Sequence, residues 1–140
     1  MRASAVKAAI VAAVEAIAPD SNAGGEVFAY VDLGGRDPSA ITERAFTVDL
    51  TSISRSEFIT VDCQVVVFEL VAFFHNYTGV EDRIADDSER IIKALNTLHE
   101  QAADLYAVEF GDVDVAPSRA MDGMLEAASS LSVTYRRTGV

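Results

Sequence analysis

Cysteine, basic residues and long apolar runs are scarce in this sequence. The single cysteine, Cys63, has no partner for an internal disulfide, which is typical of a protein made in a reducing cytoplasm. Lys7 and Glu15 interrupt the one early apolar run, so we expect no secretory signal peptide. Eleven basic residues stand against 22 acidic ones, and the net charge of −11 disfavours binding to nucleic-acid phosphates or anionic membranes. These scarcities favour a protein as the binding partner.

The most apolar stretch, VDCQVVVFELVAFFHNY at residues 61–77, does not read as a membrane span. It contains Asp62, Glu69 and His75, whereas a span needs about 20 predominantly apolar residues. Its β-branched and aromatic content predicts a strand instead, with strict alternation at its start. Both faces of this strand are apolar over residues 65–74, and one domain covers one face with helices. We therefore expect another layer or another chain to cover the second face, and part of the strand to project from the domain.

The rest of the pattern predicts a single domain over residues 1–140, without internal repeats. The expected elements are a helix at 3–18, a short strand at 27–33, a strand at 46–51, the long strand from 61, a helix at 86–101, and strands at 106–115 and 125–135. Loops are expected at 34–40 and 117–123, where glycine and proline concentrate. The fold class is therefore α+β, with a mostly antiparallel sheet and two main helices packed on one face.

Two local patterns make this prediction specific. Asp86 and Glu89 have capping-box spacing at the start of the second helix, and Glu89 can pair with Lys93 one turn later. Gly111 shifts the alternation of the strand that contains it, as a β-bulge does.

Residues that carry chemistry are few, and none predicts a catalytic, cofactor-binding or metal site. His75 and His99 lack metal-ligand spacing, both to each other and to Cys63. We interpret His75 as an aromatic residue at a strand end, His99 as a cation near the negative end of a helix dipole, and Cys63 as a buried packing residue. The carboxylates of 81–89 offer oxygen ligands for Mg²⁺ or Ca²⁺ but lack the glycine and spacing of a calcium loop, which favours a solvated helix start.

Three smaller features also read as structural. Asp112 and Asp114 alternate with valines and should lie on the exposed face of a strand. The glycine pairs that begin at positions 24 and 34 are not followed by the lysine or helix start of a phosphate loop, so they indicate turns. Arg136 and Arg137 form a basic pair that is too small to bind nucleic acid unaided.

The element order resembles that of the tail-terminator proteins of long-tailed bacteriophages, also called tail-completion or minor tail protein U-like proteins. The local sequences that carry the resemblance are VFAYVDLGG, RAFTVDL, ITVDCQVVVFEL, DDSERIIKAL, YAVEF and LSVTYRR. The resemblance covers nearly the whole chain and implies a ring, typically of six subunits, that caps the finished tail tube and stops its polymerisation. It implies as partners other copies of the chain, the tail-tube protein and the head connector, at the head-tail junction of the virion, for a protein made in the host cytoplasm. No cofactor and no membrane are implied.

The acidic charge of the chain is compatible with such a ring, and other classes of function stay open. Acidic walls repel phosphates, so DNA could slide through the channel without specific binding. Repulsion between acidic subunits should weaken assembly at low ionic strength. Other head-to-tail joining proteins and tail-tube subunits share this layout. A small α+β ligand-binding dimer and a metal-dependent enzyme that uses Asp86 and Asp87 are the two alternatives from other classes.

Overall fold

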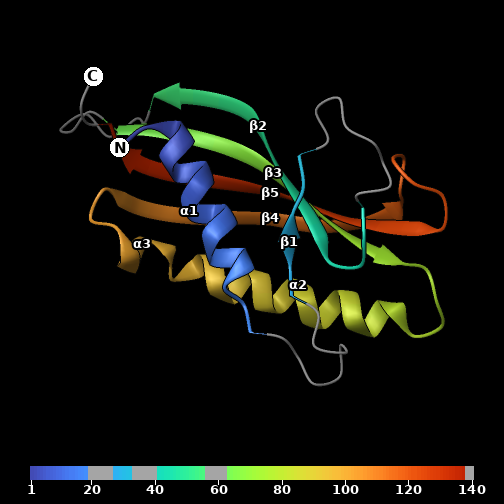
Figure 1. Ribbon diagram of the computed structural model, residues 1–140. Coiled ribbons are helices and arrows are strands. Elements are labelled where there is room, and N and C mark those ends of the chain that lie inside the picture. The colour runs from blue at the N-terminus through green and yellow to red at the C-terminus, as the bar shows by residue number, and fades with distance from the viewer. Residues whose placement is uncertain (19–26, 33–40, 56–62, 138–140) are drawn as a thin grey trace.

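The computed structural model describes residues 1–18, 27–32, 41–55 and 63–137, and Figure 1 shows how their helices and strands are arranged. The elements are α1 (Ala3–Glu15), β1 (Ala29–Tyr30), β2 (Ala45–Arg55), β3 (Cys63–His75), α2 (Val80–Asn96), α3 (Leu98–Gln101), β4 (Leu105–Pro117) and β5 (Met124–Arg136). This confirms the predicted α+β fold and its order of helix, hairpin, helix and hairpin. Within the described residues no helix is long and apolar enough to cross a membrane.

The five strands form one sheet in the order β1-β2-β3-β5-β4, with β1 and β4 at the two ends of the sheet. β1 runs parallel to β2, and every other pair is antiparallel. The central pair, β3 and β5, keeps one register from end to end. Register shifts occur in the outer strands, after Leu50 in β2 and after Leu105 and Phe110 in β4. The last of these confirms the bulge predicted at Gly111.

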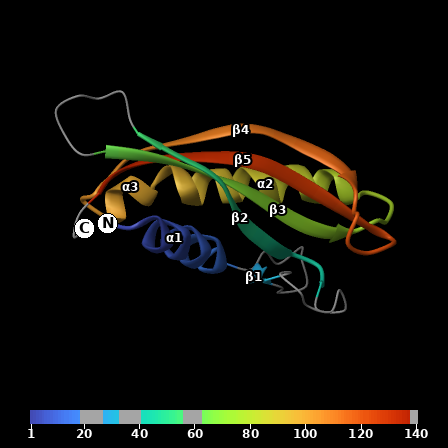
Figure 2. The ribbon, with the colours of Figure 1, turned by 90° about the horizontal axis from the view of Figure 1, so that it is seen from above.

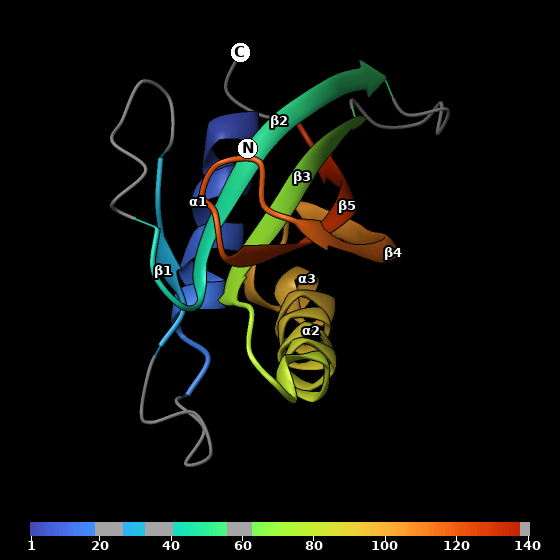
Figure 3. The same cartoon turned by 90° about the vertical axis from the view of Figure 1, so that its right-hand side faces the viewer.

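The helices pack against the same side of the sheet, as Figures 1 and 2 show, and we call the other side the open face. Figure 3 looks nearly along α2 and shows how strongly the strands twist above it. Alternate residues of β3 point into the core beneath the helices: Val66, Phe68, Leu70, Ala72 and Phe74. The helices contribute the stripes Val6, Ile10 and Val14 from α1, and Val80, Ile84, Ile91 and Leu95 from α2. The core therefore combines every second residue of a strand with residues that repeat about every 3.6 positions along the helices.

The expectation that β3 needs another chain to cover its second face is wrong for half of the strand. Around the last residues of β3, the open face carries a second buried cluster made of Ile41, Ala45, Val71, Phe73 and Met124. Ala120 and Met121, in the turn between β4 and β5, pack against this cluster. Towards the other end Val65 and Val67 are only half-buried and Glu69 is exposed. Part of the loop expected at 117–123, with residues that adjoin the expected loops, therefore covers the surface that was expected to need a partner.

Several element boundaries also differ from the prediction: β2 runs on to Arg55, and the helix expected at 86–101 is divided into α2 and α3. The second main helix begins at Val80 rather than at 86, so Asp86 lies within α2 and forms no capping box. Gly79 has a φ of 90°, a conformation that favours glycine, and it turns the chain into α2. The strand expected at 27–33 is only Ala29–Tyr30. The loop at 34–40, both glycine pairs and the first two residues of the expected long strand lie outside the described residues.

Candidate assembly surface

A buried ion pair between Arg44 and Asp87 fixes the start of β2 to the middle of α2. Arg44 donates from Nε and Nη2 to the two carboxylate oxygens of Asp87, both at 2.8 Å, and each residue is only 1% exposed. The guanidinium also lies 5.3 Å from the ring centre of Phe28. Arg44 has a φ of 65°, an unfavourable conformation that persists where surrounding contacts hold it. Since both carboxylate oxygens accept from Arg44, we assign this pair a structural role.

The other carboxylates near α2 do not form a binding site with Asp87. Glu81, Asp82, Asp86 and Glu89 are exposed along the helix, while Asp87 points into the protein. Within the described parts of the chain, no three histidine, cysteine or acidic side chains are placed to hold a metal ion. The carboxylates of 81–89 therefore lie on different sides of α2, and the most buried of them is already bonded to Arg44.

The other residues considered from the sequence lie apart from one another. Cys63 is buried at the start of β3, and Asp112 and Asp114 are exposed in β4, as expected. His99 is exposed in the short helix α3. His75 is exposed at the end of β3, where its backbone N–H donates to Glu43 Oε2 at 2.7 Å. The fold brings no two of these side chains together as a reactive pair.

Burial raises the pKa of the Tyr135 phenol because it disfavours the charged phenolate, and the positive charge of Arg137 acts in the opposite direction. The hydroxyl donates to Gln64 Oε1 at 2.7 Å, between β5 and β3. An amide oxygen is a hydrogen-bond acceptor but no useful base at neutral pH. This contact therefore joins two strands rather than activating the phenol.

Both ends of the sheet have an edge that no described strand pairs. β1 pairs with Ala45 and Phe46 only, so residues 47–55 of β2 extend beyond it. β4 pairs with β5 on one side and with no described strand on the other. In Figure 1 the arrowhead end of β2 lies well away from β1. Unpaired strand edges present backbone donors and acceptors that can bind another strand.

Apolar side chains are exposed at both edges, on the same side of the sheet as the helices. Leu50 and Ile53 of β2 are 53% and 49% exposed. They pair with Phe68 and Val66, which point beneath the helices, and cross-strand partners share a face. Val115 of β4 is 51% exposed and lies on that same side. Each edge thus combines unpaired backbone with uncovered aliphatic surface.

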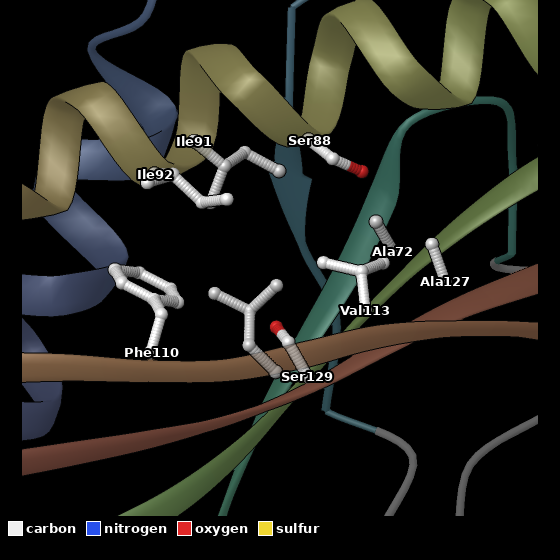
Figure 4. A pocket seen from close by; sticks show the side chains of 9 residues that line it. Ala72, Ser88, Ile91, Ile92, Phe110, Val113, Ala127 and Ser129 are labelled. Carbon is white, nitrogen blue, oxygen red and sulfur yellow. The ribbon is translucent and has the colours of Figure 1, made fainter.

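The β4 edge also borders a groove of about 320 Å³ between β4 and α2. Its walls are Val113 and Val115 from β4, and Glu81, Ile84, Ala85 and Ser88 from α2. Inward it meets a gap of about 10 Å³, drawn in Figure 4, where the small side chains Ala72, Ala127 and Ser129 face α2. That gap holds at most about one water molecule. The groove is therefore closed at its inner end and open to solvent at the β4 edge.

The open face is acidic and has one broad depression. Asp49 and Glu69 lie directly opposite each other on β2 and β3, and both are exposed. The depression, of about 560 Å³, has Val71 and Phe73 in its floor and Arg119 in its rim. Like charges on directly opposed residues destabilise a sheet. Asp114 of β4 is exposed on this side as well, and exposed carboxylates repel phosphates.

The side chain of Glu126, although it also lines this depression, is used by the protein itself. Its Oε1 accepts from Ser118 Oγ at 2.9 Å and from the backbone N–H of Arg119 at 3.2 Å. These bonds hold the turn between β4 and β5 against the open face. Glu126 therefore positions the rim of the depression.

Sequence reasoning missed the Arg44–Asp87 pair, although one signal for it was present. Asp87 falls on the apolar stripe of α2 between Ile84 and Ile91. An acidic residue on the buried stripe of a helix needs a charged or hydrogen-bonding partner in the core. The signal predicts that such a partner exists, but not which of the arginines it is.

Neither a protein-family model nor a curated protein matches the chain. Its function must therefore be argued from the edges, the groove and the distribution of charge described above.

Proposed function

We propose that the chain is a structural subunit of a phage virion, a tail terminator that forms a ring on the tail tube. The ring would cap the tube, end its polymerisation and offer a surface to the head connector. The resemblance in element order and local sequence supports this proposal, and the two unpaired edges of one sheet are the observation that carries it. A sheet with an available edge at each end suits repeated association with copies of itself, which rotation about an axis closes into a ring.

The charge distribution supports a channel for DNA through such a ring. The chain carries −11, and the open face presents Asp49, Glu69 and Asp114. Acidic walls reduce adhesion of the phosphate backbone, so DNA can pass without being held. Six such subunits repel one another, and the proposal therefore requires that assembly strengthen as salt rises from a low concentration.

A structural role also agrees with how the chain uses its polar residues. The carboxylate that we considered for a metal, Asp87, is bonded to Arg44, and Asp86 points away from it. Glu126 holds a turn. We therefore propose no catalytic residues, cofactor or metal for this protein.

Light scattering coupled to size-exclusion chromatography tests the proposal. The protein should form a closed oligomer, expected to be a hexamer, at moderate salt, and negative-stain images should show rings alone or at the ends of tail tubes. Adding the protein to polymerising tube protein should shorten the tubes. A chain that stays monomeric at its highest soluble concentration and leaves tube length unchanged contradicts the proposal.

A second candidate function, a ligand-binding dimer, is favoured by the depression on the open face. Its apolar floor and charged rim, with Arg119 and Glu69, are features of small-molecule sites. Native mass spectrometry distinguishes the two. A stable dimer that retains a ligand supports this second function, and a ring without bound ligand supports the first.

A further inference from the structure

We propose that copies of the chain join head to tail, with the free edge of β2 in one subunit pairing with the free edge of β4 in the next. In this arrangement Leu50 and Ile53 of β2 enter the groove between β4 and α2. The inference rests on the proposed self-association and specifies the surface that produces it.

Strand direction permits this pairing. Three successive antiparallel pairs, β2–β3, β3–β5 and β5–β4, separate the outer strands, so β2 and β4 run in opposite directions. A second subunit placed in the same orientation therefore presents its β2 antiparallel to the β4 of the first. The sheet continues across the junction, with the helices of both subunits on one side.

The side chains at the two edges are complementary on that side. Leu50 and Ile53 are about half-exposed on β2, Ile53 beside a hollow that the start of α1 also lines, while the groove beside β4 has room for side chains. All these features lie on the helix-covered side of the sheet, so continuation of the sheet brings them together. Removing these half-exposed aliphatic side chains from water favours association.

Charge distinguishes this junction from the symmetric alternative in which two β4 edges pair. β4 carries Glu109, Asp112 and Asp114 and no basic residue. Two copies of β4 would place these carboxylates against one another, which destabilises a sheet. Residues 47–55 of β2 carry one acidic residue, Asp49, and one basic residue, Arg55, so this segment adds no net negative charge to the β4 edge. A β2–β4 contact joins different surfaces, and repetition of it yields a ring or a filament.

Complementation between two variants tests the inference. The Leu50→Asp/Ile53→Asp variant should lose its β2 surface and keep its β4 surface, and the Val115→Asp variant should do the reverse. Each variant alone should then be monomeric by light scattering, whereas an equimolar mixture should form a dimer of twice the subunit mass. A variant with the same two charges on the exposed side of α1, Ala8→Asp/Ala12→Asp, should still assemble like the wild type.

Disulfide trapping gives a second readout that does not depend on loss of assembly. In a Cys63→Ala background, the Ile53→Cys and Val115→Cys variants should cross-link to each other when mixed, and neither should cross-link to itself. Cross-linking of Ile53→Cys with itself indicates a symmetric β2–β2 contact and overturns the inference. If the wild type forms rings but the variants neither complement each other nor cross-link when mixed, self-association uses another surface. That result overturns this inference and leaves the proposed function standing. A wild-type chain that never associates overturns the proposed function as well.

Discussion

The two halves of β2 pair with the same strand, β3, and differ completely in burial. Ala45–Val48, the first half, is buried at every residue, and Asp49–Arg55, the second half, is exposed at every residue. The first half has β1 beside it, α2 bonded to its preceding residue Arg44, and part of a buried cluster on the open face. Among the described strands, the second half pairs with β3 alone, and its Ile53 borders a hollow that the start of α1 also lines. We therefore infer that the first half contributes to folding, and the proposed association would use the second half.

The largest effect should come from the anchor of the first half. Replacing Arg44 with methionine leaves the buried Asp87 with only the longer contact to Arg90, at 3.5 Å, which should lower the free energy of unfolding by about 3 kcal/mol. Urea unfolding of dilute protein, followed by circular dichroism, measures this loss. Arg55→Met in the second half is the matched control and should change stability by no more than about 0.5 kcal/mol.

The double variant Arg44→Met/Asp87→Leu then tests whether the loss comes from an unpaired charge. Because it removes both buried charges, it should recover most of the stability that Arg44→Met loses. A double variant as unstable as Arg44→Met would contradict the role given to the ion pair.

A smaller difference should separate two aliphatic residues on the same side of β2. Val48→Ala removes fully buried methyl groups and leaves a cavity, which should cost about 2 kcal/mol. Ile53→Ala removes more carbon atoms from a half-exposed side chain and should cost less than about 1 kcal/mol in the monomer. Equal losses in urea unfolding would contradict the division of β2 into a folding half and an association half.

The smallest expected effect is a gain in stability, and it comes from Asp49, where the second half of β2 begins. Asp49→Asn removes the repulsion between Asp49 and Glu69, so it should stabilise the protein by about 0.2–1 kcal/mol at low salt. The gain should fade as salt screens the exposed charges. Glu69→Gln should give a similar gain, and the two together should add little more, since either one removes the repulsion. Thermal unfolding at two salt concentrations measures these differences.

Much of the fold could be predicted because its elements follow local patterns. Alternation marked β2, β3, β4 and β5, helical spacing marked α1 and α2, and Gly111 marked the bulge in β4. The start of α2 was misplaced because Asp86 and Glu89 have the spacing of a cap, whereas the apolar stripe continues back to Val80. The capping spacing and the apolar stripe indicate different helix starts, and burial of the stripe determines where α2 begins.

The contacts that could not be predicted join residues far apart in the sequence. Arg44 and Asp87 are separated by 43 positions, and nothing near Arg44 indicates a positive φ or a partner in α2. The cover over Val71 and Phe73 comes from Ile41 and Met124, which adjoin segments that read as loops. Burial of an apolar strand face by its own connecting segments depends on how loops fold back, and periodicity carries no information on that.

The register shifts confined to the outer strands have a consequence for how the protein avoids misassembly. A shift after Leu50 in β2 and another after Phe110 in β4 break each exposed edge into short regular segments, whereas the protected centre has none. Stacking of identical strands into fibrils requires long, flat and regular edges. The interrupted edges therefore favour pairing with one neighbour in one alignment over the open-ended stacking that forms amyloid.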